Sequence, residues 1–268
     1  MSSDEYMSSK NLLFKRLNEL DTIFSHLHEY DTSFSHVHRK ISIDTVNFFE
    51  REFKFLDIFL SFQSFTDEPN MLDVTRKVHA LFQNAAVAFS ELGLDKSFYR
   101  YTSKVRKEIC LTKKEISDKY SFPRISLPLE SNKDGVMEFI DTVVARLNVL
   151  VVIDEEGSLI YVPNAMRSIL DELNLLQDFL VFVSSRFIEP QSQHHVVNLF
   201  RHVLAVAGHT SLLVWLYLPW SGSKNLEYLD PGEVNGLLSH FLQMMIRPIR
   251  PCIRRIYVDV LQALKSII

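Results

Sequence analysis

Apolar residues recur three and four positions apart along most of the chain, which is the spacing of one face of an α-helix. The first such stripe runs over 9–39, and a second, rich in phenylalanine, runs over 42–65. The second stripe is so wide that neighbouring elements must bury it from two sides. The phenylalanines that form it are Phe48, Phe49, Phe53, Phe55, Phe59, Phe62 and Phe65.

The rest of the chain continues the helical pattern, so the predicted fold class is an all-α bundle of about eight to ten helices. The helix over 95–119 carries Lys104, Arg106, Lys107, Lys113 and Lys114, which we expect on solvated outer faces. At 149–162 a β-branched run leaves a short hairpin open as an alternative to helix. The later helices are predicted over 70–93, 95–119, 136–153, 164–187, 203–220, 230–245 and 252–268.

A proline-containing polar stretch near the middle of the chain predicts a linker, because Pro123, Pro128 and the cluster at 131–135 favour extended, loop-like backbone. A short echo, DTIFSHLH at 21–28 and DTSFSHVH at 31–38, is interpreted as a local repeat of sequence only. The predicted organisation is a helical extension over 1–40, a helical subdomain over 41–122, a linker over 123–135 and a second helical subdomain over 136–268.

The stretch 203–223 is the most apolar of the chain and contains no charged residue other than His209, so a membrane span has to be considered. Polar residues at 208–211 and Pro219 would be costly at bilayer depth, whereas a protein core can satisfy them. A buried core helix is therefore favoured. The alternative is a module that contacts membrane or lipid through 203–220 and the arginine-rich C-terminal helix.

Composition narrows the class of protein. Twenty phenylalanines against seven glycines suit long helices better than a many-stranded fold. The net charge of −4 does not indicate nucleic acid as a partner of the whole surface. Cys110 and Cys252 are far apart, which fits a reducing compartment. The polar, acidic N-terminus does not resemble a secretory signal, so the expected location is the cytoplasm, with peripheral membrane contact as the alternative.

No motif for catalysis or for binding a cofactor or metal is present. His195, His202 and His209 are seven residues apart, which on a helix is roughly 10 Å, too far to share one zinc ion. No glycine precedes a lysine in the manner of a phosphate-binding loop, and no nucleophile elbow occurs. We therefore expect no enzyme activity, no cofactor and no metal in this chain.

The C-terminal end is the most basic part of the chain. Over 246–268 five basic residues stand against the single acidic Asp259, a local charge of +4. The segment is predicted either to border a further domain or to dock onto an acidic partner surface or anionic lipid. The candidate docking residues are Arg247, Arg250, Arg254 and Arg255.

Several stretches together resemble the N-terminal domain of nightshade late blight resistance proteins, which are intracellular plant immune receptors of the nucleotide-binding, leucine-rich-repeat (NB-LRR) type. The resemblance covers about 45–268 in collinear order, and its closing segment is the most specific part. The stretches are FLDIFLSFQSF, KKEISDKYSFPRISLP, VMEFIDTVV, HVLAVAGHTSLLVWLYLP and LDPGEVNGLLSHFLQMMIRPIRPCIRRIYVDVLQALKS.

The resemblance implies a role in pathogen defence and the hypersensitive response, as an interaction and regulatory domain. It implies protein partners: a pathogen effector, a host kinase or other guarded host protein, or another copy of the receptor. ADP or ATP is implied only for the nucleotide-binding module of such receptors, which this chain is expected to lack. The resemblance transfers no catalytic or nucleotide-contacting residue to this sequence.

Overall fold

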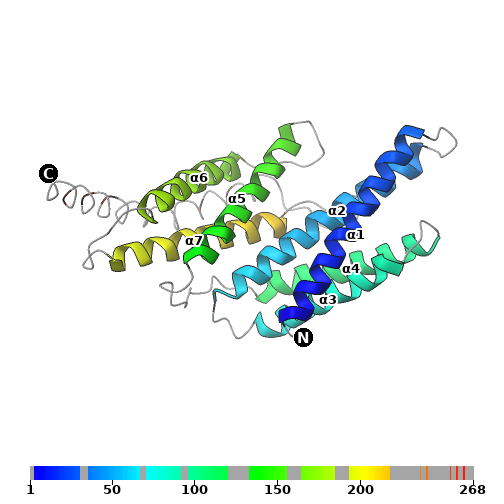
Figure 1. The fold of residues 1–268 in the computed structure, drawn as a ribbon, viewed down its shortest axis with the longest axis horizontal. Coiled ribbons are helices and arrows are strands. Elements are labelled where there is room, and N and C mark those ends of the chain that lie inside the picture. The colour runs from blue at the N-terminus through cyan, green and yellow to red at the C-terminus, as the bar shows by residue number, and fades with distance from the viewer. Residues whose placement is uncertain are drawn as a thin grey trace. The chain divides into compact units, whose positions relative to one another are not determined.

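The computed structural model describes seven stretches of the chain, 3–30, 36–66, 71–91, 96–119, 133–155, 164–184 and 193–217, and the single positions 236, 240, 254, 258 and 262. The described stretches form seven α-helices and no strand (Figure 1). The helices are α1 (Ser3–Tyr30), α2 (His36–Gln63), α3 (Leu72–Glu91), α4 (Lys96–Lys119), α5 (Lys133–Glu155), α6 (Asn164–Ser184) and α7 (Gln193–Tyr217).

The all-α class is confirmed, and the described stretches account for seven of the predicted eight to ten helices. The two helices predicted over 230–245 and 252–268 lie outside the described residues, except for the five single positions, which are helical. The hairpin alternative is wrong for 149–155, because α5 continues through Glu155. Residues 156–162 lie outside the described part.

The long first helix predicted over 9–39 is in fact two helices. Helix α1 ends at Tyr30 and α2 begins at His36. The two helices pack against each other, so they are separate helices and not one continuous rod. The apolar periodicity alone did not reveal this break.

The chain divides into two compact units. Unit 1 comprises 1–63 and 68–123, and unit 2 comprises 64–67 and 124–268. The predicted domain boundaries after 40, 122 and 135 stay a prediction, and most of the predicted linker 123–135 lies outside the described residues.

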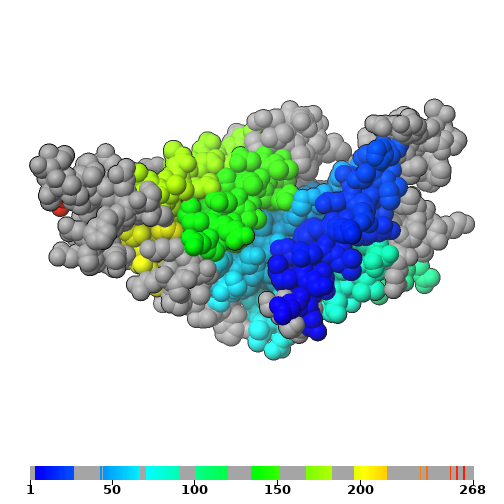
Figure 2. All heavy atoms as spheres, in the orientation of Figure 1, coloured from blue at the N-terminus to red at the C-terminus, as the bar shows by residue number. Residues whose placement is uncertain are grey.

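Unit 1 is a bundle of α1 to α4, in which α1 packs on α2 and α3, and α4 packs on α3 and α2. On the face drawn in Figure 2, α1 forms a continuous ridge over unit 1. The wide phenylalanine stripe is buried as predicted, since each of its seven phenylalanines is at most 5% exposed. Edge-to-face ring contacts join α2 to α3, with centroids 5.2 Å apart for both Phe49–Phe89 and Phe53–Phe82.

Unit 2 contains α5, α6 and α7, each of which packs on the other two. Phe65, in the short segment 64–67, contacts Phe139 of α5 with ring centroids 5.6 Å apart. Within α7, Val196–Trp215 is long and apolar enough to cross a membrane, but 72% of that window is buried inside the structure. A core helix passes the same test of length and composition. The prediction of a buried core helix is confirmed for 203–215.

Replacing Phe53 with alanine should lower the free energy of unfolding of unit 1 by about 3–5 kcal/mol, because a fully buried ring is lost and a cavity remains. Urea unfolding followed by circular dichroism measures the effect, while fluorescence of Trp215 and Trp220 reports unit 2 alone. The matched control is Val87→Ala, since Val87 is 50% exposed on α3. Equal midpoints for the two variants would contradict the packing described above.

Candidate functional site

The arginine-rich docking face predicted at the C-terminal end can be described at one position only. Arg254 has helical backbone and an exposed side chain. Arg247, Arg250 and Arg255 lie outside the described residues. The docking face over these four arginines therefore stays a prediction.

A buried charge cluster joins α2 to α4 in unit 1. The side chain of Glu52 is completely buried. Arg51 donates from Nη2 to Glu52 Oε1 at 2.7 Å, and Lys113 of α4 places its Nζ 3.8 Å from Glu52 Oε2. An unpaired buried charge would cost several kcal/mol, so the two cations are what allows this carboxylate inside the bundle.

The same cluster extends to Arg106, which lies about two turns before Lys113 along α4. The guanidinium of Arg106 lies over the ring of Phe48 at 4.5 Å from its centroid, and Arg51 lies over the same ring at 5.5 Å. Such cation–π contacts contribute about 0.5–2 kcal/mol each. Burial lowers the pKa of Arg106 from its ordinary value, and Glu52 opposes that change.

Arg106 and Lys113 were expected on outer faces of their helix, and this expectation is wrong. Lys113 is 5% exposed and Arg106 is half-buried. The sequence held a signal, because both residues lie three or four positions from Ile109, which is buried in α4. Glu52 gave a second signal, since it falls inside the phenylalanine stripe of α2, and a buried carboxylate needs cations or hydrogen-bond donors close to it.

Burial sets the protonation chemistry of the cluster. It lowers the pKa of Lys113 to about 8, and the neighbouring Glu52 carboxylate acts in the opposite direction. Burial, with a further contribution from Glu52, raises the pKa of the Cys110 thiol. A raised thiol pKa keeps Cys110 protonated and a poor nucleophile. The cluster is thus suited to holding two helices in register, not to nucleophilic chemistry.

A second polar junction fixes α1 to the bundle. The Tyr6 hydroxyl donates to Asp57 Oδ1 of α2 at 2.5 Å, and Lys10 Nζ lies 2.7 Å from Asp57 Oδ2. The Tyr6 ring also meets the edges of His79 and Phe82 of α3, with centroids 4.5 and 5.6 Å apart. Burial first, and the Asp57 carboxylate second, raise the pKa of Tyr6. One tyrosine therefore connects three helices.

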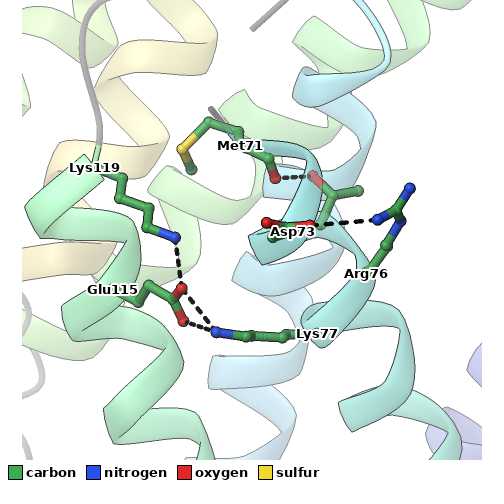
Figure 3. Close-up of polar contacts among 7 residues, drawn as sticks. Met71, Asp73, Arg76, Lys77, Glu115 and Lys119 are labelled. Atoms are coloured by element: carbon green, nitrogen blue, oxygen red, sulfur yellow. Dashed lines mark hydrogen bonds and ion pairs between the residues drawn. The ribbon is translucent and has the colours of Figure 1, made fainter. Parts of the chain in front are cut away.

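A third set of contacts lies on the surface between α3 and α4 (Figure 3). Lys77 of α3 reaches both carboxylate oxygens of Glu115 of α4, at 2.7 and 2.8 Å, and Lys119 reaches the same carboxylate at 2.7 Å. Hydrogen bonds from the two lysines lower the pKa of Glu115. Because the group is exposed, its contribution to stability is small.

The outward side of α4 carries cations that form no ion pair with a described residue. Arg100, Lys104, Lys107, Leu111 and Lys114 follow spacings of four, three, four and three, so they share one helix face, which we call the basic stripe of α4. All four cations are exposed, and no ion pair joins them to a described residue. Leu111, within the stripe, is 59% exposed.

The lack of pairing is specific to this stripe. In unit 1, each other lysine or arginine with a described side chain makes an ion pair or a cation–π contact. These paired residues are Lys10, Lys15, Arg16, Arg51, Lys54, Arg76, Lys77, Arg106, Lys113 and Lys119. The basic stripe is therefore the part of the described surface of unit 1 where positive charge is available to a partner.

Unit 2 has a short buried polar segment in the middle of α7. His209, Thr210 and Ser211 are each at most 2% exposed, and Ser211 Oγ donates to the carbonyl of Gly208 at 2.8 Å. Thr210 Oγ1 has no hydrogen-bond partner among the described residues. Burial lowers the pKa of His209 to about 4, so the imidazole is neutral at pH 7.

Metal-ligand geometry is not found in the described stretches. No group of three or more His, Cys, Asp or Glu side chains in them lies close enough to hold an ion. His202 and His209 lie on α7, and burial lowers the pKa of both. The side chain of His195 lies outside the described part.

The fold and these contacts define an all-α module whose described charged groups bind helices together or face solvent. The sequence model of the family described as "NB-LRR: Late blight resistance protein R1" matches residues 106–268. The chain belongs to this family of late blight resistance NB-LRR proteins.

Named relatives from Solanum demissum agree with the family match. The chain is 38% identical over 264 residues to the putative late blight resistance protein homolog R1B-16, covering 86% of this chain and 20% of that protein. It is also 38% identical over 264 residues to late blight resistance protein R1-A, and this match covers 85% of this chain and 20% of that protein. Against homolog R1B-8 the identity is 43% over 176 residues, covering 63% of this chain and 14% of that protein.

The chain thus spans about a fifth of the length of the first two relatives. No solved structure matches it.

Replacing Lys113 with methionine should remove an increase in the free energy of unfolding of unit 1 that the wild-type chain shows as the pH rises above about 8. Between pH about 8 and 10.4 the unfolded chain holds the Lys113 proton and the folded chain does not, so the free energy of unfolding increases with pH, by up to about 3 kcal/mol. The comparison is made in a Cys110→Ala background, because the raised thiol pKa has the opposite sign in this window. Urea unfolding of unit 1 at pH 7 to 10 measures this dependence of the free energy of unfolding on pH. If the profiles with and without Lys113→Met run parallel, the prediction is refuted.

Acid should destabilise unit 2 through His209. Between pH 6.5 and 4 the unfolded chain binds a proton that the buried imidazole excludes, so the free energy of unfolding falls by about 3 kcal/mol as the pH falls. His209→Gln should flatten this dependence, whereas His240→Gln, at an exposed position, should leave it intact. Tryptophan fluorescence during urea unfolding follows unit 2, and an unchanged pH profile in His209→Gln would disprove the assignment.

Proposed function

We propose that this chain is a non-catalytic interaction and regulatory domain of a plant NB-LRR disease-resistance receptor. Membership of the late blight resistance family supports a role in pathogen defence, and we extend this to the hypersensitive response and to a cytoplasmic location. The partners are proteins: a pathogen effector, a host kinase or other guarded host protein, or another copy of the receptor.

The basic stripe of α4 is the observation that carries the proposal. Four exposed cations that form no ion pair with a described residue, together with the exposed Leu111, combine long-range attraction with an apolar contact. Complementary charge steers a partner and fixes its register more than it adds affinity, while the apolar residue supplies the desolvated centre. Nothing in this arrangement requires a reaction to occur on the surface.

Membrane insertion through 203–220 receives no support from the described part of that stretch. Residues 203–215 fill the centre of unit 2, and extracting them would expose the core of α5 and α6 to water. A contact with protein explains the exposed groups of α4 without unfolding a unit.

Reversing charge on the stripe should weaken partner binding. The tagged chain is incubated with leaf extract, and retained proteins are compared between wild type and Lys104→Glu/Lys107→Glu. Retention should decrease in the variant and with added salt, since the attraction is electrostatic. The control is Lys15→Glu/Arg76→Glu, whose side chains are 75% and 69% exposed elsewhere on unit 1. The same proteins held equally by all three chains would show that the stripe is not a binding surface.

A further inference from the structure

Helix α6 carries an exposed stripe that repeats the spacing of the basic stripe of α4 with opposite charge. Asp171, Leu175, Asp178 and Phe182 follow spacings of four, three and four, and we call them the acidic stripe of α6. Leu175 is 65% exposed, and Phe182 is stacked on Phe179 with centroids 6.3 Å apart. An exposed leucine between two exposed aspartates thus faces away from the core of unit 2, with the half-buried Phe182 at the end of the stripe.

The aspartates of this stripe have charge available for a partner. Asp171 and Asp178 are exposed, and no ion pair joins either of them to a described residue. The surroundings have the same sign, because each exposed charged side chain described on α5, α6 and α7 is acidic. These residues are Asp134, Glu138, Asp141, Asp171 and Asp178.

We infer that the basic stripe of α4 in one copy of the chain docks on the acidic stripe of α6 in a second copy. The inference rests on the proposed function as an interaction domain and names its partner. The two stripes supply opposite charges around an exposed leucine, and one chain carries both. No third component is needed to satisfy either surface.

The two stripes also fit in register. Lys107 lies four residues before Leu111 and Lys114 lies three after it, while Asp171 and Asp178 hold the same positions around Leu175. Each charged pair spans seven residues, about 10 Å of helix. With Leu111 against Leu175, either relative direction of the helices brings each lysine to an aspartate. Alternation of three and four is also the spacing with which facing helices interdigitate.

The contact is heterologous, because it joins two different surfaces. Each copy can therefore use its α4 with one neighbour and its α6 with another, so assembly proceeds beyond a dimer unless the rotation closes a ring. Exposed charge pairs contribute little each, so the free chains associate weakly and reversibly. Tethering copies within larger receptors would raise the effective concentration at which the contact forms.

The test is sedimentation velocity of the 268-residue chain at increasing concentration and at two salt concentrations. Wild type should show a weight-average mass that rises with concentration and falls with salt. Lys107→Glu/Lys114→Glu should weaken association at least about tenfold, and so should Asp171→Lys/Asp178→Lys, because each places like charges opposite one another. Circular dichroism confirms that both variants stay folded.

Charge exchange makes the test specific to these two stripes. A mixture of the two double variants should associate again, since the acidic α4 of one meets the basic α6 of the other. The quadruple variant should also regain association. Lys15→Glu/Arg76→Glu changes the net charge of unit 1 by the same amount and should associate as wild type does.

A wild-type chain that stays monomeric at every concentration would overturn the inference. The inference would also be overturned if the two double variants lose association and neither their mixture nor the quadruple variant regains it. The wild-type chain could instead stay monomeric and float with phosphatidylserine vesicles, and Lys107→Glu/Lys114→Glu could abolish that vesicle binding. This result would assign the basic stripe to anionic lipid and refute the inference. A monomer that still retains leaf proteins through α4 would refute the second copy as partner and leave the proposed function standing.

Discussion

A single buried carboxylate constrains how unit 1 is assembled. Glu52 lies within the phenylalanine stripe of α2, where the cations beside its buried carboxylate are Arg51 of the same helix and Lys113 of the facing helix α4. Helix α4 supplies Lys113 and turns its buried side toward α2 and α3. Once that side of α4 faces inward, its opposite side, with the basic stripe, must face solvent. The interior pairing thus determines which surface is offered to partners.

The basic stripe of α4 and the exposed charged groups of α5 to α7 have opposite signs. The described surface of unit 1 presents unpaired cations on α4, and the exposed charges of α5 to α7 in unit 2 are carboxylates. The net charge of −4 conceals this separation. Long-range attraction between unlike surfaces therefore exists although the chain as a whole is weakly acidic.

Periodicity predicted the helical class, the buried phenylalanines of α2 and the core position of 203–215, because burial follows directly from apolar spacing. It did not predict that α1 ends at Tyr30 and α2 begins at His36, because the helical pattern was taken to continue to residue 39. It also misplaced Arg106 and Lys113, because a lysine was assumed to be solvated. The stripes of α4 and α6 could be read from spacing alone, but that their charges lack partners required coordinates.

The attachment of α1 has a practical consequence for solubility. Helix α1 buries Leu13, Leu17 and Leu20 against its neighbours, and its Phe14 ring meets Phe82 of α3 with centroids 6.3 Å apart. A truncated chain that began after residue 40 would leave the α1-facing sides of α2 and α3 as one apolar patch open to water. Patches of that kind promote aggregation in otherwise folded proteins. Residues 3–30 therefore bury this apolar surface and keep unit 1 soluble.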